Sequence, residues 1–144
     1  MTRVFLDSDV MLDFLLGREL FSVSAGMIFA HAETGKIELC TSTVAFLNVH
    51  YIAETQRNKA EARKLAIQLE SIVSLLPVSP AMVSAALRSG TGDLEDAVQY
   101  QCALENKVDF LVTRNVKDYP KKGLPVMTPD VFLGTIPQSA PQTN

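Results

Sequence analysis

The sequence predicts an α/β protein in which a central, mainly parallel β-sheet is covered by helices on both faces, as a three-layer α/β/α sandwich. Short apolar runs that resemble buried strands alternate along the chain with longer segments of helical apolar spacing. The first of these runs ends in the acidic triplet Asp7-Ser8-Asp9. The length of 144 residues and the apolar fraction of 47% suit one compact domain with a sizeable core. Strands separated by helices favour parallel pairing with right-handed crossovers.

Five elements are predicted in the first part of the chain, in this order: a strand at 4–6, a helix at 10–16, a helix at 22–34, a strand at 36–41, and a helix from 43 to about 55. Residues 4–6 are continuously apolar, whereas residues 36–41 alternate apolar and polar side chains. Gly17 and Gly35 are the predicted helix stops. Ser42 or Thr43 is the expected N-cap of the last helix.

Seven further elements are predicted: a helix at 58–75, a short strand at 75–78, a helix that begins at 79–80 and ends at 90–92, a helix at 94–106, strands at 110–112 and 125–127, and a helical turn that begins at 128–129. The helix at 58–75 has an apolar face opposite a charged one. Pro80 suits the first turn of a helix. The polar, proline-bearing end of the chain predicts disorder, so we divide the chain into one domain, 1–134, and a disordered tail, 135–144.

Composition excludes several classes of protein. A formal net charge of -3 argues against a protein that coats nucleic acid through bulk positive charge. Two cysteines, Cys40 and Cys102, indicate neither a disulfide framework nor a four-ligand zinc site. Acidic residues interrupt the apolar N-terminal stretch, which therefore resembles neither a signal peptide nor a membrane span. We expect a soluble, cytoplasmic protein without membrane contact.

Acidic side chains at strand ends and helix starts suggest a metal site. The acids in question are Asp7, Asp9, Asp93, Glu95, Asp96 and Asp118. Ligands in parallel sheets bind beyond the carboxyl ends of the strands, so Asp7, Ser42 and Asn115 should lie close together. Clustered carboxylates repel one another unless they are solvated or bind a cation, and Mg²⁺ needs only one or two of them. Each acid taken singly also suits a turn or a helix cap, as Asp93 does.

Two segments resemble the PIN-domain family, which includes the VapC toxins of toxin-antitoxin modules. DLEDAVQYQCALENKVDFLVTRNVKDY, residues 93–119, is similar to the C-terminal half of PIN domains, and FLDSDVMLDFL resembles their opening strand. The resemblance covers about residues 4–133 and implies the PIN fold. It implies catalytic roles for Asp7, Asp96, Asp118 and Asn115, and metal contacts from Asp7, Asp96, Asp118, Asn48 and Asp93. Asn48 departs from the family, because many PIN nucleases have Glu there and an amide binds metal more weakly.

The resemblance further implies an endoribonuclease that uses Mg²⁺ or Mn²⁺ to hydrolyse RNA, leaving a 5′-phosphate and a 3′-hydroxyl. A carboxylate such as Asp96 would accept the proton of the attacking water. Substrate contacts are expected from Ser42, Thr113, Arg114 and Lys117. The basic segment that begins at Arg114 can equally be a solvated loop. VapC-like proteins usually form homodimers and bind an antitoxin, so both partners are implied.

Two other functions remain open. If Asn48 marks a lost site, the chain is a weakened PIN module that binds RNA or a protein partner. FLDSD also resembles the Asp-x-Asp motif of haloacid-dehalogenase phosphatases, but Gly92-Asp93 begins a helix instead of following an apolar strand. A metal-independent ribonuclease is not favoured, because His31 and His50 are both predicted on helices, away from strand ends.

Overall fold

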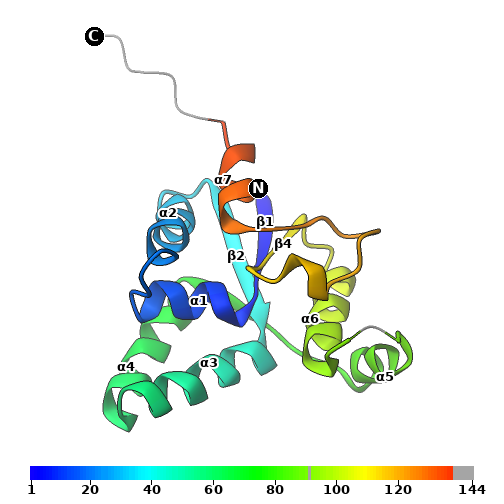
Figure 1. Ribbon diagram of the computed structural model, residues 1–144, viewed down its shortest axis with the longest axis horizontal. Helices are drawn as coiled ribbons and strands as arrows, with labels where there is room; N and C mark the ends of the chain where they lie inside the picture. Colours follow the sequence, from blue (N-terminus) through cyan, green and yellow to red (C-terminus); the bar gives the residue numbers. More distant parts are fainter. Residues whose placement is uncertain (91, 138–144) are drawn as a thin grey trace.

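The computed structural model describes residues 1–90 and 92–137. Its sheet has the strand order β3-β2-β1-β4-β5, and every neighbouring pair is parallel. Figure 1 labels the three central strands, β2, β1 and β4. The strands are β1 (Thr2–Leu6), β2 (Ile37–Ser42), β3 (Val73–Leu76), β4 (Phe110–Val112) and β5 (Val126–Met127). The predicted parallel α/β sheet is therefore confirmed.

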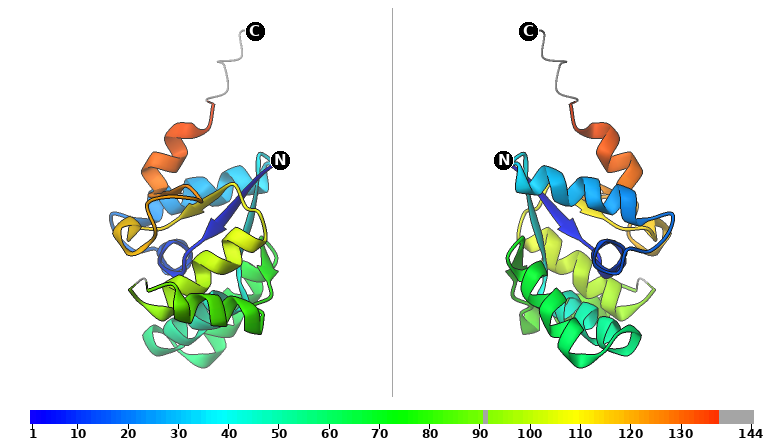
Figure 2. Two further views of the ribbon diagram at one scale, coloured as in Figure 1. Left: turned by 90° about the vertical axis from the view of Figure 1, so that its right-hand side faces the viewer. Right: turned by 90° about the vertical axis from the view of Figure 1, so that its left-hand side faces the viewer.

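Helices cover both faces of this sheet (Figure 2). They are α1 (Ser8–Leu15), α2 (Ser22–Glu33), α3 (Thr43–Gln56), α4 (Lys59–Glu70), α5 (Pro80–Arg88), α6 (Leu94–Glu105), α7 (Pro129–Thr135) and the 3₁₀ helix η1 (Val116–Asp118). Successive side chains of a strand point to opposite faces of the sheet, so neighbouring residues of β1 pack into different cores. Val4 and Leu6 pack with α1, α2, α3 and α7, whereas Phe5 packs with α5 and α6. The fold is the predicted three-layer sandwich.

The helix predicted at 58–75 is shorter than its apolar pattern suggested. Asn58 caps α4, and its side chain accepts a hydrogen bond of 2.8 Å from the backbone N–H of Glu61. The helix ends at Glu70, and Val73 begins β3. Parallel pairing with β2 places Val73 beside Leu39. The prediction was wrong here because long-range strand pairing overrode local helical spacing, and the predicted strand at 75–78 accordingly begins two positions earlier.

The first helix starts earlier than predicted, at Ser8, because the Asp7 carboxylate caps it. At the other end, α7 includes Thr135, which the sequence assigned to the tail, while residues 138–144 lie outside the described part of the chain. Thr91, one of the predicted stops after α5, is also outside it. Within the described residues, the longest apolar helices fall short of what a membrane crossing requires.

Candidate active site

An acidic pocket of about 310 Å³ lies beyond the carboxyl ends of the strands. We call it the acidic pocket; its lining residues are Asp7, Ser8, Asp9, Leu12, Arg18, Asn48, Ile52, Asp93, Glu95, Asp96 and Asn115. They come from the β1–α1 junction, α3, the start of α6 and the segment after β4. Of the three residues that the strand-end rule predicted to lie together, Asp7 and Asn115 line this pocket, whereas Ser42 does not.

Asp7 is held in a fixed orientation at the end of β1. Its backbone N–H donates to the carbonyl of Val112 at 3.0 Å and extends the pairing with β4. Its Oδ1 accepts from the N–H of Ser8 at 2.7 Å. Its Oδ2 accepts from the hydroxyls of Thr113 and Tyr119, both at 2.8 Å. With only 8% of Asp7 exposed, these three donors stabilise the charged carboxylate.

Tyr119 is a positioning residue that the sequence reasoning missed. Burial, followed by the charge of Asp7, raises the pKa of its hydroxyl far above the ordinary value. The hydroxyl therefore stays protonated and remains a donor to Asp7. The only sequence signal was its place next to Asp118 in the motif that resembles the family.

Asp9 joins the start of α1 to the segment after β4. Its Oδ2 accepts hydrogen bonds from the backbone N–H of Arg114 at 3.0 Å and from the amide of Asn115 at 3.3 Å. Burial, then the nearby Asp7, raises the pKa of Asp9 to about 6. Asp9 thus holds Asn115 at the acidic pocket through a hydrogen bond to its side-chain amide.

Asp96 occupies the first turn of α6, the helix that Asp93 caps. The Asp93 carboxylate accepts a hydrogen bond of 3.2 Å from the backbone N–H of Asp96. Burial, followed by the charges of Asp7, Asp93, Asp118 and Glu95, raises the pKa of Asp96 to about 7. Burial, followed by the charges of Asp93 and Asp7, also raises the pKa of Glu95. Carboxylates crowded in this way favour a bound cation.

Asp13 anchors two arginines beneath the acidic pocket, and the sequence reasoning treated it only as an interruption of an apolar stretch. Its side chain is 1% exposed. It accepts from Nε of Arg114 at 2.7 Å and from Nη2 at 3.2 Å. Nη1 of Arg18 lies 3.6 Å from it. Arg18 lines the acidic pocket and places a positive charge beside the acids.

The family model of the PIN domain matches residues 3–117. The chain belongs to the PIN-domain family. No curated protein matches the sequence. The phosphatase alternative is not supported, because Asp93 caps α6 and does not follow a strand.

Solved structures of the same fold share little sequence with this PIN domain. A toxin-antitoxin complex from Klebsiella pneumoniae is 20% identical, with a TM-score of 0.64 over 88% of this chain and 97% of the other. The VapC20 toxin of Mycobacterium tuberculosis, described as cleaving the sarcin-ricin loop, is 13% identical, with a TM-score of 0.61 over 75% and 86%. DNA-bound VapBC from Salmonella typhimurium is 14% identical, with a TM-score of 0.63 over 88% and 97%.

The remaining predicted residues of this PIN domain lie in different environments. Asn48 and Asp93 line the acidic pocket. Asp118 is exposed on η1 and does not line it, although its charge reaches Asp96. Lys117 is also exposed and outside the lining.

Ser42 and Thr113, predicted to contact substrate, are both 0% exposed. Ser42 caps α3 by accepting from the N–H of Ala45 at 2.9 Å, and its hydroxyl donates to Gln99. Thr113 donates to Asp7. Their polar groups satisfy buried partners, which corrects the expectation of direct contact: in this structure both act through their neighbours.

The donor set of the acidic pocket suits a hard divalent cation, because its ligating atoms are carboxylate and amide oxygens. Within residues 1–90 and 92–137, no group of three or more His, Cys, Asp or Glu side chains is arranged to hold a metal ion. Mg²⁺ typically takes one or two protein carboxylates and completes its shell with water and substrate phosphate. Asp7 and Asp96 are sufficient for that kind of site.

Proposed function

We propose that this PIN domain is an endoribonuclease that hydrolyses RNA phosphodiester bonds with Mg²⁺ or Mn²⁺. The observation that carries the proposal is the gathering of Asp7, Asp9, Asp93, Glu95 and Asp96 in the acidic pocket, where burial first and the charges of neighbouring acids second raise the pKa of Asp96 to about 7. Crowded carboxyl groups resist ionisation because their negative charges repel one another, and a bound cation removes this repulsion. The pocket is open and polar, and it lies where parallel sheets bind their ligands.

In this proposal, Asp7 and Asp96 would hold the cation, with Asn48 and Asp93 from the same pocket lining as further oxygen donors. Asp118 lies outside that lining and would act on the site through its charge. The bound ion would supply a water of lowered pKa and neutralise charge on the phosphate. Tyr119 and Thr113 keep the Asp7 carboxylate oriented toward the pocket by donating to its Oδ2. The Asp96 carboxylate would accept the proton of the attacking water.

RNA phosphates would meet positive charge at the edge of the acidic pocket. Arg18 lines the pocket directly. Lys117, Lys121 and Lys122 are exposed on the segment after β4. With a net charge of -3 on the whole chain, this local group is the part of the surface that we expect to hold the phosphate backbone.

Cleavage should require metal and should not use the RNA 2′-hydroxyl. The two histidines lie on α2 and α3, and neither lines the acidic pocket, so no histidine pair is available there for general acid and base catalysis. We expect EDTA to abolish cleavage, Mn²⁺ to restore it, and the products to carry 5′-phosphate and 3′-hydroxyl ends. Product ends can be identified by phosphatase and ligase treatment followed by mass spectrometry. Activity in EDTA, or a 2′,3′-cyclic phosphate, would contradict the mechanism.

The same assay tests the weakened-module alternative, which the neutral amide of Asn48 favours. Asn48 is half-buried and lines the acidic pocket. If the chain binds RNA in Mn²⁺ but leaves it uncut, and Asn48→Glu then cuts it, the chain is a binding module that lacks one ligand. Cleavage by the parent excludes this alternative.

We also propose that the chain is the toxin of a toxin-antitoxin pair, forms a homodimer and is held by an antitoxin segment on α3 and α4. Exposed apolar side chains on these helices support a partner surface: Leu47 and Tyr51 are each 66% exposed, and Ile67 is 62% exposed. Leu47 and Ile67 line a groove of about 300 Å³. Similar folds occur in solved toxin-antitoxin complexes.

Co-expression with the protein encoded by the neighbouring reading frame tests this surface. We expect that protein to copurify and to inhibit cleavage. Leu47→Asp and Ile67→Asp should release it while the free nuclease stays active. Val131→Asp is the matched control, because Val131 is 57% exposed on α7, away from the groove. Equal binding by all three variants would show that the antitoxin lies elsewhere.

A further inference from the structure

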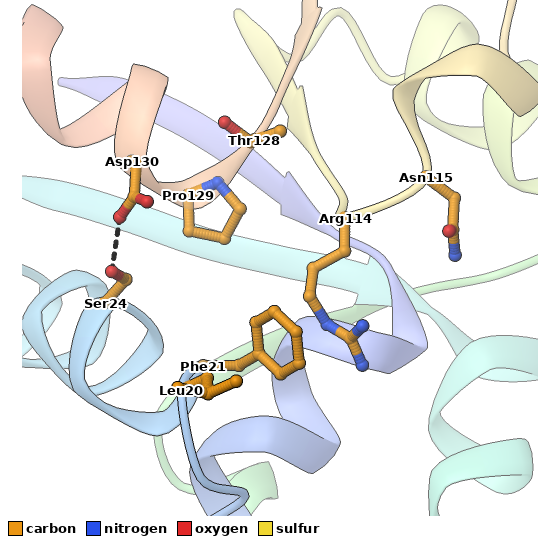
Figure 3. A pocket seen from close by; sticks show the side chains of 8 residues that line it. All are labelled: Leu20, Phe21, Ser24, Arg114, Asn115, Thr128, Pro129 and Asp130. Carbon is orange, nitrogen blue, oxygen red and sulfur yellow. Dashed lines mark hydrogen bonds between the residues drawn. The ribbon is translucent and has the colours of Figure 1, made fainter.

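A second pocket, of about 330 Å³, adjoins the acidic pocket (Figure 3). We call it the side pocket; its lining residues are Leu20, Phe21, Ser24, Arg114, Asn115, Thr128, Pro129 and Asp130. They come from the loop after α1, the start of α2, the segment after β4 and the start of α7. Asn115 lines both pockets, so a chain that crosses the acidic pocket can place its next unit in the side pocket.

Arg114 forms a rigid, planar wall of the side pocket. Two nitrogens of its guanidinium bind the buried Asp13 carboxylate, at 2.7 and 3.2 Å. The guanidinium carbon lies 4.0 Å from the centre of the Phe21 ring (Figure 3). An arginine held along one edge and over one aromatic ring loses little further entropy when a flat group stacks on it.

The loop beside Arg114 exposes apolar side chains in a strained conformation. Leu20 is 92% exposed and has a φ of 72°, which branched L side chains rarely adopt. Phe21 is 40% exposed. Leu20 gains almost no burial in the free chain that would offset this strain, and strain of this kind occurs preferentially at ligand sites.

The opposite side of the pocket presents hydrogen-bond acceptors. The hydroxyl of Ser24 donates to Oδ1 of Asp130, which connects α2 to α7 (Figure 3). Asp130 is exposed at this wall. Its carboxylate can therefore accept a hydrogen bond from the edge of a ligand that is stacked on Arg114.

We propose that the side pocket binds one nucleobase of single-stranded RNA, the base next to the scissile phosphate, packed against the stacked pair of Arg114 and Phe21. Bases of single-stranded RNA commonly stack on aromatic rings and on arginine guanidinium planes. An exocyclic amino group of adenine, cytosine or guanine donates to Asp130. Uracil fits less well, because two carbonyl oxygens flank its only ring N–H. This inference rests on the proposed nuclease function and adds to it a specificity pocket.

The first experiment measures single-turnover cleavage of the shortest RNA oligonucleotide that the chain cuts, with an abasic nucleotide placed on either side of the scissile bond. At one of the two positions, removal of the base should lower kcat/KM about tenfold for the parent chain. Phe21→Ala should lower the cleavage of the intact RNA by a similar factor. Phe21→Ala should then show almost no further loss on the abasic RNA. Losses that multiply, or an abasic RNA that the parent cuts normally, would overturn the proposal.

The second experiment tests the acceptor. The parent should prefer cytidine to uridine at the sensitive position, and Asp130→Asn, whose amide can both donate and accept, should reduce this preference. Val131→Ala is the matched control, since Val131 follows Asp130 on α7 but does not line the side pocket. An unchanged preference in Asp130→Asn would overturn the role of the carboxylate.

Binding of nucleoside monophosphates separates this inference from the proposed function. Cytidine monophosphate, titrated into the parent chain in EDTA, should shift the backbone amide NMR signals of Leu20, Phe21 and Asp130 more than uridine monophosphate does. If these shifts occur but no RNA is cut, the nuclease function fails and the base pocket stands. If RNA is cut but neither the shifts nor the abasic effect occur, the base pocket fails and the nuclease function stands. Occupation by an antitoxin peptide without any nucleotide response would also overturn the base pocket.

Discussion

Replacing Asp96 by asparagine is expected to lower the rate of metal-dependent RNA cleavage by about a thousandfold, because the change removes a proposed metal ligand and proton acceptor from the centre of the acidic pocket. The shape of the side chain is almost unchanged, so the fold should be retained. Single-turnover cleavage in excess Mn²⁺ measures the loss. Glu105→Gln is the matched control: it removes the same charge from the other end of α6, away from the acidic pocket.

Asp96→Asn should lose cleavage activity, but without metal it should not lose stability. The pKa of Asp96 is about 7 in the folded chain, against 3.8 for the ordinary side chain. Between about pH 4 and pH 7 the folded state therefore holds a proton that the unfolded state has lost, and the free energy of unfolding falls as the pH rises. Asp9, with a pKa of about 6, adds a contribution of the same sign. Asp96→Asn should flatten this fall and be at least as stable as the parent at pH 8 in EDTA.

In excess Mn²⁺ the parent should be more stable than Asp96→Asn, since the parent gains stability by binding an ion that the variant binds poorly. Melting curves in EDTA and in Mn²⁺, recorded from pH 4 to pH 8, test both halves of the prediction. If Asp96→Asn is less stable in EDTA and is raised equally by metal, Asp96 is a structural cap and not a ligand.

Arg114→Met is expected to lower the free energy of unfolding by about 3 kcal/mol, because it leaves the buried Asp13 carboxylate without its two-point partner. Arg18, whose nearest nitrogen is 3.6 Å from Asp13, compensates only in part. Arg18→Met is the comparison, and we expect a loss of about 1 kcal/mol or less from this longer, partly exposed contact. Urea unfolding with unchanged m-values measures both differences.

A double variant gives the sharper test of the Asp13 pair. Asp13→Leu combined with Arg114→Met removes both partners and leaves no buried charge, so it should recover part of the stability that Arg114→Met loses. If the double variant is less stable than the parent by the full sum of the losses of Asp13→Leu and Arg114→Met measured singly, the two residues do not act as a pair, and the rigidity attributed to Arg114 has another source.

The sequence by itself determined most of the elements and the general position of the acids. Apolar runs, helical spacing and caps are local signals, and each is readable within one or two turns of chain. Continuous apolar residues before Asp7 and after Asp109 predicted β1 and β4, which the structure contains. Once the sheet was taken as parallel, the rule on strand ends placed Asp7 and Asn115 at one edge, and both line the acidic pocket.

Only the tertiary structure decided which side chains bind one another. Asp13 and Arg114 are 101 positions apart, and Asp7 and Tyr119 are 112 apart, so no local pattern links them. Three of the four residues 73–76 are apolar and suit a helix or a strand, and pairing with β2 selected the strand. Ser42 and Thr113 are buried, and their hydroxyls bond to buried groups: Ser42 accepts from the backbone N–H of Ala45, and Thr113 donates to the Asp7 carboxylate. Such choices depend on the summed free energy of contacts between distant segments, which exists only once the sheet has assembled.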